Sequence, residues 1–215
     1  MKIKLAHLAA GVAVVSHFAV AEVPSYEVIN EAQFGTGDSK EVLRLKFADG
    51  KTIAIDSCSN YLTALRNHGR AREFDGGQQN INSAMVNLPL CEARDYLDTN
   101  KLHALPGQAV ITPQLLPAGV YWAFNHERQS FAKSLPDTAN LSEAEKGIVK
   151  NGDEKYSAEG INYQLTNLGQ IDPDKIIVQI SNTLDGGSIF YSRLFILSTK
   201  NTPWSVKKEF SFFSE

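Results

Sequence analysis

The stretch from Lys175 to Leu197 constrains the fold of this 215-residue chain more than any other part. Two apolar runs, 176–180 and 189–197, flank a polar break at 182–188 that contains Asp-Gly-Gly-Ser. The runs are rich in Ile, Val, Phe and Tyr, which suit a pleated, half-buried surface, and glycine tolerates the backbone angles of a tight reversal. The sequence therefore predicts a β-hairpin here. This hairpin carries no catalytic motif, so the sequence says more about fold than about function.

The first 21 residues have the pattern of a secretory signal peptide. Lys2 and Lys4 precede an apolar segment from Leu5 to Val20. A small-x-small cleavage site lies at its end, at Ala19–Ala21. The alternative is an uncleaved N-terminal anchor, although the segment is short for a membrane span. We expect residues 1–21 to be removed and the mature protein to be periplasmic or secreted, with no integral membrane span after cleavage.

The charge balance bears on the class of partner. The chain has 21 Lys and Arg against 24 Asp and Glu, a net charge of −3. Removing the two lysines of residues 1–21 would leave 19 basic residues against 24 acidic ones, a net charge of −5. A mildly acidic protein lacks the basic surface that nucleic acid requires. We therefore expect no nucleic-acid partner, and an envelope or secreted protein as the partner.

Cys58 and Cys91 are the only cysteines, and both lie in the part that would be exported. In an oxidising compartment an even pair indicates a disulfide. The alternatives are a free thiol nucleophile or half of a metal site, but two widely separated cysteines with no nearby His pair do not match zinc spacing. We predict a structural disulfide between them, and no metal ion or cofactor.

The predicted fold class is α+β, with an N-terminal β-hairpin plus disulfide-tied helices and a C-terminal antiparallel sheet. Alternating apolar residues, Asp-Gly turns, capping residues and prolines set the boundaries of its elements. In the first half we expect a hairpin over 42–55, a helix capped by Ser59 or Asn60 and ended by Gly69, a polar loop over 70–80, and helices over 81–88 and 89–98. In the second half we expect a strand over 120–124, a helix over 142–150 with a Ser142–Glu145 capping box, a turn over 169–174 and a strand over 204–213.

The domain organisation follows from a proline-containing connector over 105–119. Proline and its preceding residue favour extended backbone, so such a stretch is a natural boundary. The predicted divisions are a signal peptide at 1–21, a hairpin and Cys-tied helical part at 22–104, and a mainly antiparallel β part at 120–215. The alternative is a single domain.

Several short segments resemble a group of exported bacterial proteins of unassigned function. In that group a G-D-x-N-G-D-G segment precedes an apolar strand, a Gly-Gly-Thr/Ser turn and a strand ending in Leu-Phe-Leu-Leu-Thr. The corresponding segments here are 169–174, 186–188 and 194–199, together with Cys58-Ser59-Asn60-Tyr61 and Cys91. The acidic segment departs from the pattern at Pro173. The resemblance implies an envelope location and a mixed fold, and it implies no activity.

Two pairs of residues are candidates for catalysis. Ser130-Phe131-Ala132-Lys133 matches the S-x-x-K pattern of acyl-serine enzymes, in which a lysine lowers the barrier to serine deprotonation, but its companion motifs S-D-N and K-T-G are absent. His126 and Glu127 could act as acid and base, although no H-E-x-x-H motif is present. A chance pattern and a surface pair are the competing interpretations.

Two further segments are candidates for binding. Asp172 and Asp174 could belong to a calcium loop, but later ligand positions hold apolar residues, so a polar turn is the favoured interpretation. Tyr121, Trp122 and Phe124 offer aromatic contact area to a sugar or peptide, although aromatic residues at strand spacing also fill cores.

The leading functional hypothesis is a non-catalytic envelope protein that binds another macromolecule, such as an inhibitor or an immunity-like protein. The alternatives are a cell-envelope hydrolase, with Ser130 and Lys133 or His126 and Glu127 at its centre, and a purely structural envelope component.

Overall fold

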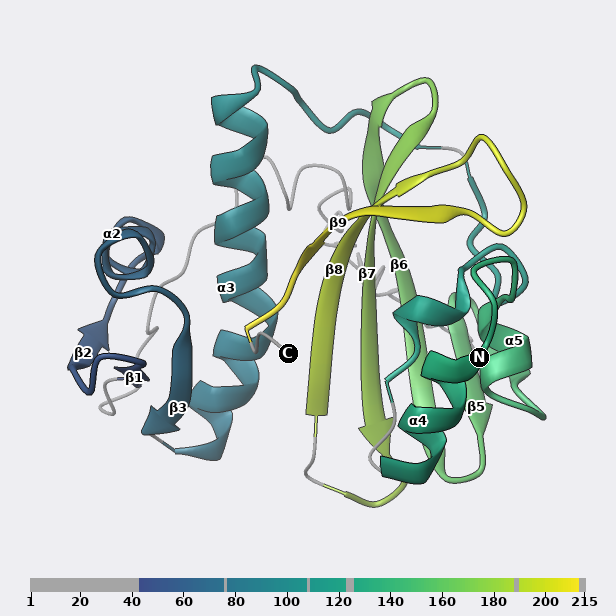
Figure 1. The fold of residues 1–215 in the computed structure, drawn as a ribbon, viewed down its shortest axis with the longest axis horizontal. Coiled ribbons are helices and arrows are strands. Elements are labelled where there is room, and N and C mark those ends of the chain that lie inside the picture. Colours follow the sequence, from purple (N-terminus) through teal and green to yellow (C-terminus); the bar gives the residue numbers. More distant parts are fainter. Residues whose placement is uncertain (1–42, 76, 108, 123–125, 188–189, 213–215) are drawn as a thin grey trace, which may run out of the picture.

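The protein contains two antiparallel sheets with a long helix between them (Figure 1). The structure is a computed structural model and describes residues 43–75, 77–107, 109–122, 126–187 and 190–212. A three-stranded sheet has the order β2-β1-β3, and a six-stranded sheet has the order β4-β5-β6-β7-β8-β9. The predicted α+β class is confirmed, with an N-terminal hairpin, disulfide-tied helices and a C-terminal antiparallel sheet.

The small sheet contains the predicted hairpin and one strand that was not predicted. Strand β1 (Leu43–Phe47) turns at Gly50, whose φ is +84°, into β2 (Thr52–Ile55). Side chains of β1 are alternately buried and exposed, as in a half-buried strand. Strand β3 (Ala71–Asp75) pairs with β1 where a polar loop was expected. That prediction is wrong because β3 is held by its pairing with β1, and only Ala71 of its residues is fully buried.

Helix α2 (Cys58–His68) begins at Ser57, whose hydroxyl accepts a hydrogen bond from the Asn60 N–H at 3.2 Å. The cap was predicted later, at Ser59 or Asn60, and that prediction is wrong. The earlier serine is the one with extended backbone, which lets its side chain reach the first free N–H groups. The predicted end at Gly69 is confirmed, with φ +73°.

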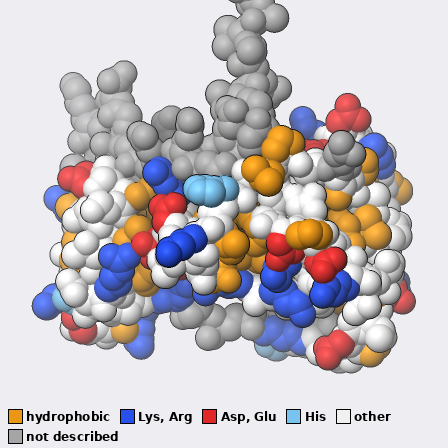
Figure 2. All heavy atoms as spheres, turned by 90° about the horizontal axis from the view of Figure 1, so that it is seen from above, with side chains coloured by type: hydrophobic (Ala, Val, Ile, Leu, Met, Phe, Trp, Pro, Cys, Tyr) orange, Lys and Arg blue, Asp and Glu red, His pale blue; other side chains and the backbone are white. Residues whose placement is uncertain are grey.

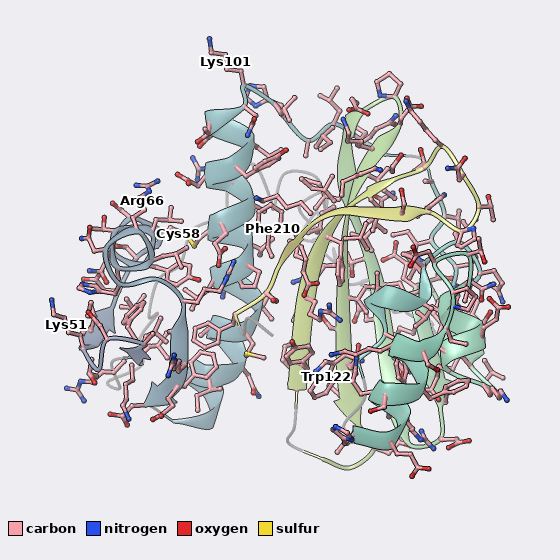
Figure 3. The ribbon with its side chains drawn as sticks, viewed as in Figure 1. Lys51, Cys58, Arg66, Lys101, Trp122 and Phe210 are labelled. Carbon is pink, nitrogen blue, oxygen red and sulfur yellow. A yellow bond between two sulfur atoms is a disulfide. The ribbon has the colours of Figure 1, made fainter. Side chains whose placement is uncertain are left out.

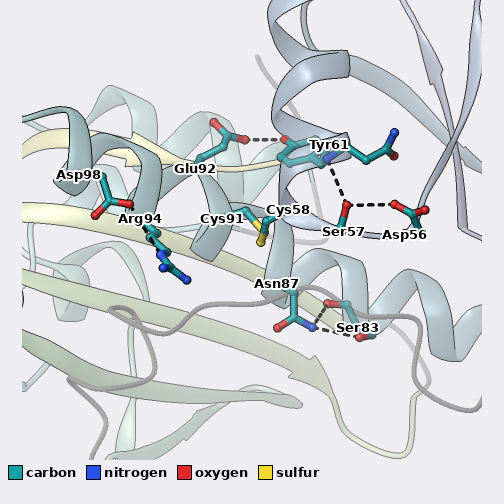
Figure 4. Close-up of a disulfide and its surroundings, with 11 residues drawn as sticks. Asp56, Ser57, Cys58, Tyr61, Ser83, Asn87, Cys91, Glu92, Arg94 and Asp98 are labelled. Carbon is teal, nitrogen blue, oxygen red and sulfur yellow. Dashed lines mark hydrogen bonds and ion pairs between the residues drawn. A yellow bond between two sulfur atoms is a disulfide. The ribbon is translucent and has the colours of Figure 1, made fainter.

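Helix α3 (Gln78–Thr99) is continuous where two helices were expected around Pro89. Proline inside a helix costs about 3 kcal/mol because it removes one backbone hydrogen bond. Both neighbours of Pro89 are almost completely buried, and burial of this part of the helix offsets that cost. The predicted disulfide is confirmed, since Cys58 and Cys91 are bonded with their Cα atoms 5.4 Å apart (Figure 4).

The middle of the chain differs most from prediction. The aromatic segment is not a strand in its described part, since the 3-10 helix η1 (Ala118–Val120) ends where Tyr121 begins; residues 123–125 lie outside the described residues. Helix α4 (His126–Ser134) was not predicted. Helix α5 (Leu141–Ala144) is shorter than expected, and its capping box is Asn140 with Glu143. The predicted box with Glu145 is wrong because that side chain is buried.

The large sheet includes the predicted central hairpin, formed by β7 and β8 with Lys175 opposite Ser198. The turn expected over 169–174 is largely wrong, because 169–172 belong to β6 and the glycine there sits at a bulge. A bulge uses the same conformational freedom of glycine as a turn does. The strands are β4 (Val149–Gly152), β5 (Lys155–Ala158), β6 (Ile161–Asp172), β7 (Lys175–Leu184), β8 (Phe190–Ser198) and β9 (Ser205–Phe210).

Each face of the large sheet packs against different elements. Helix α3 packs on one face, where Ile177, Leu194 and Ile196 join its buried residues in one core cluster. The connector, η1, α4 and α5 cover the other face. A third cluster joins the small sheet, α2 and α3 and includes Phe212 from beyond β9. The division of the chain at 105–119 stays a prediction.

None of the helices in the described part of the chain combines the length and the apolar composition that a membrane crossing needs. The predicted signal peptide, residues 1–21, lies outside the described residues.

Candidate functional site

The four residues predicted as catalytic candidates all lie on α4. His126, Glu127, Ser130 and Lys133 are exposed, and Ser130 and Lys133 are one helical turn apart. Activation of a serine by a lysine requires both groups in one site. Lys133 lines a groove, described below, whose lining does not include Ser130. A catalytic role for either pair stays a prediction.

The predicted aromatic binding residues are held against the sheet. Tyr121 is 1% exposed, and Trp122 is half-buried with its ring stacked on Tyr191 at 4.1 Å between centroids (Figure 3). Arg193 donates to the carbonyl of Tyr121 at 3.4 Å, and Asn182 donates to that of Trp122 at 3.3 Å. Phe124 lies outside the described residues. The structure gives Tyr121 a core position, and a partner contact through Trp122 stays a prediction.

A buried carboxylate beneath α4 was missed by sequence reasoning. Glu145 is 3% exposed and accepts a hydrogen bond from the Tyr163 hydroxyl at 2.6 Å. Arg128 of α4 pairs with Glu145 at 3.7 Å and also with the exposed Glu159. The buried hydroxyl of Tyr121 has no hydrogen-bond partner among the described residues. No sequence pattern reveals this cluster, because its members are separated along the chain from Tyr121 to Tyr163.

Burial dominates the chemistry of this cluster. Burial, with the neighbouring Glu145 charge as a smaller cause, raises the pKa of Tyr121 to about 12. Burial and the hydrogen bond to Glu145 raise the pKa of Tyr163 as well. Both hydroxyls are therefore protonated at neutral pH, and that of Tyr163 donates to Glu145. With the ion pair between Arg128 and Glu145, this hydrogen bond holds α4 and α5 against the sheet.

A second buried carboxylate fixes the chain beyond β9. Glu92 of α3 accepts from the Tyr61 hydroxyl at 2.6 Å, beside the disulfide (Figure 4). Arg70 forms a two-point ion pair with Glu92, at 3.0 and 2.7 Å. The same guanidinium donates to the carbonyl of Ser211 at 2.6 Å. The C-terminal end of β9 is therefore tied to the N-terminal half of the protein.

The acidic turn is paired with lysines. The Asp172 carboxylate forms an ion pair with Lys175 and accepts a hydrogen bond from the Asp174 N–H at 2.8 Å. The Lys175 ammonium lowers the pKa of Asp172, and Lys200 pairs with Asp174 at 3.1 Å. Among the residues that the structure places, no three His, Cys, Asp or Glu side chains gather as metal ligands would. These contacts support the interpretation of 172–174 as a polar turn.

A groove of about 420 Å³ lies between η1, the end of α4 and the start of β9. Its lining exposes polar and apolar surface in about equal parts and includes Trp204 and Val206, the latter 40% exposed. Lys133 and Asp137 contribute one charge of each sign. The remaining lining residues are Pro117, Ala118, Gly119, Ala132, Leu135, Pro136, Ala139 and Ser205. The apolar part of this lining can contact one apolar side chain of a partner.

Strand β9 adjoins this groove and forms one edge of the large sheet. No strand in the described part of the chain pairs with its outer side. An edge strand presents unpaired N–H and C=O groups to any chain that lies beside it. Lys207 and Lys208 are both exposed on β9, and lysines on an edge strand protect it from pairing with other edges. The groove was missed because residues far apart in the sequence form it.

Charged side chains of both signs are mixed on one face of the molecule. On the face shown in Figure 2, acidic and basic side chains are interspersed, with hydrophobic side chains between them. That face therefore lacks a single sign of charge.

The chain matches no protein-family model, no curated protein and no solved structure. The case for a function therefore rests on the edge strand and the groove beside it.

Proposed function

We propose that this protein is an exported, non-catalytic envelope protein that binds an extended segment of another protein along β9 and in the adjoining groove. The observation that carries the proposal is a groove of mixed polar and apolar lining that opens beside an edge strand with no strand on its outer side among the described residues. An extended segment added to a sheet edge gains backbone hydrogen bonds, and a pocket for one side chain adds specificity.

Export to the periplasm or beyond is the location that fits this proposal. The Cys58–Cys91 disulfide is compatible with an oxidising compartment. The N-terminal sequence pattern supports removal of residues 1–21. We expect N-terminal sequencing of the exported protein to begin at Glu22, and a product that retains Met1 would contradict export by cleavage.

The groove offers a clean way to test binding. Gly119 lines it, and a Cβ added at Gly119 would meet no atom within 4 Å. Gly119→Phe should therefore occupy the groove while leaving the fold intact. Val149→Arg is the matched control, because Val149 is an exposed valine on the opposite edge strand.

The test is affinity capture from envelope extract with the oxidised protein, followed by mass spectrometry. We expect a protein that the unmodified chain and Val149→Arg capture and that Gly119→Phe fails to capture. Capture that survives Gly119→Phe would contradict the proposed site. Ser130→Ala and His126→Ala should leave capture unchanged, since neither residue lines the groove.

A further inference from the structure

Strand β9 carries two adjacent lysines in a protein whose net charge is −3. Its one acidic residue, Glu209, is engaged by Arg193 through two hydrogen bonds of 2.7 and 2.6 Å. Lys208 lies over the rings of Tyr96 and Phe210, at 4.8 and 5.4 Å from their centroids. The ring contacts of Lys208 do not neutralise its charge, and Glu209 is already paired with Arg193. This edge therefore presents positive charge to a strand that lies beside it.

The positions of the lysines disfavour a second copy of this chain as the occupant. If two β9 strands paired antiparallel over their full length, Lys207 of each would lie opposite Lys208 of the other. A shift by one residue in either direction would place a lysine opposite the same lysine. Like charges directly opposite each other destabilise a strand pair. Pairing of β9 with the β9 strand of a second copy is therefore disfavoured, whereas a strand of opposite charge can pair with it.

We propose that the segment bound by β9 is acidic, with Asp or Glu opposite Lys207 and Lys208 and one apolar side chain in the groove. This inference rests on the proposed function and specifies the class of partner. The groove contributes no net charge, because Lys133 and Asp137 balance each other. The apolar side chains of its lining, such as the exposed Val206, therefore select the apolar side chain, while the lysines of β9 select the charge.

The size of the charge effect follows from known strand pairs. An opposite-charge pair across two strands changes affinity by roughly twofold to fivefold. Two such pairs should make an acidic segment bind about tenfold more tightly than its neutral counterpart at low salt. Because both lysines are exposed, the preference should shrink as ionic strength rises.

The experiment uses a library of random peptides, selected on the full oxidised protein and counter-selected on Gly119→Phe. We expect enriched peptides to combine two adjacent acidic residues with one apolar residue near them. Enrichment of neutral or basic peptides would overturn the acidic class and leave the proposed function standing. A failure to enrich any peptide over Gly119→Phe would overturn the proposed function itself.

Charge reversal on β9 provides a second test of this inference. Affinity of a selected acidic peptide should fall about tenfold in Lys207→Glu, whose side chain is exposed, and should be unchanged in Lys150→Glu on the opposite edge strand. Equal affinities in both variants would overturn the inference. Sedimentation of the unmodified protein should show a monomer; a dimer that Val206→Arg dissociates would make a second copy the occupant and would also overturn it.

Discussion

The two edge strands of the large sheet differ in what holds them. Strand β4 is short, its residues Val149, Lys150 and Asn151 are exposed, and among the described strands it pairs only with β5, across a register shift. Strand β9 is fixed at both ends. The N–H of Trp204, just before it, donates to the Leu115 carbonyl at 2.7 Å, and Arg70 holds the carbonyl of Ser211 just after it.

This difference shows how an edge can be both rigid and open. Contacts from Arg193 on one face and from α3 on the other fix β9 without a strand on its outer side in the described part. A binding surface that is already ordered loses less conformational entropy when a partner arrives. The edge at β4 has three exposed residues in a row and, among the described strands, pairs only with β5. We expect it to bind no extended segment.

Removal of the Cys58–Cys91 disulfide should give the largest loss of stability on the β9 side of the molecule. It ties α2 to α3, and α3 packs against β8 and β9. Replacing both cysteines by serine should lower the free energy of unfolding by about 3–4 kcal/mol, because the unfolded chain regains the entropy of an open loop. Urea denaturation of the oxidised protein and of the double variant measures this loss. An unchanged midpoint would show that the bond does not stabilise this side.

Replacement of Arg70, which anchors the end of β9, should give the second-largest loss of stability. Arg70→Ala leaves the Glu92 carboxylate, whose side chain is 8% exposed, without its ionic partner and frees the Ser211 carbonyl. We expect a loss of about 3 kcal/mol in urea denaturation. The matched control is Lys46→Ala, which removes an exposed ion pair with Glu73 and should cost less than about 0.5 kcal/mol. Equal losses would mean that β9 has no special anchor.

The arginine beneath β9 should have an intermediate effect. Arg193→Met removes the two hydrogen bonds to Glu209 and the contacts with the carbonyls of Val120 and Tyr121. The expected loss is about 2 kcal/mol, since this side chain is only 11% exposed and its bonds are charged. Lys155→Met, next to β4, should change stability by less than about 0.5 kcal/mol. A comparable loss in both variants would remove the contrast between the two edges.

The smallest effect at neutral pH is expected for the unpaired hydroxyl of Tyr121. Tyr121→Phe should change stability by less than about 0.5 kcal/mol at pH 7, because that hydroxyl has no partner among the described residues. Its raised pKa gives it an effect at high pH. In the unfolded chain a tyrosine loses its proton near pH 10, whereas burial holds the pKa of Tyr121 at about 12 in the folded protein.

Stability from Tyr121 is therefore present below about pH 10 and is lost as pH rises toward about 12. We expect Tyr121→Phe to show a shallower fall in unfolding free energy over this window than the unmodified protein. A steeper fall in the variant would contradict the assignment.

The sequence predicted the elements whose signals are local. Alternation in β1, the Asp-Gly turn after it and the apolar runs of β7 and β8 each depend on neighbours in the chain. The cysteine pair was predicted from compartment and count. Strand β3 and helix α4 lacked such signals, since β3 depends on pairing with β1. The continuity of the 22-residue α3 through Pro89 was not predicted, because burial on both sides of Pro89 outweighs the usual effect of proline.

The candidate site was less accessible to sequence reasoning than the fold. The groove combines η1, α4 and β9, which lie far apart in the chain. The catalytic candidates on α4 matched short patterns, and a pattern on one exposed helix says nothing about convergence with other elements. A surface of this kind becomes visible only when the sheet order places β9 at an edge.

The most direct test of the central claim is hydrogen exchange of the backbone amides, with and without an acidic peptide selected on the protein. If the peptide adds to the edge of the sheet, exchange should slow at outward-facing amides between Val206 and Glu209 and remain unchanged between Val149 and Gly152. Slowed exchange in β4, or protection elsewhere with none in β9, would contradict strand addition at this edge.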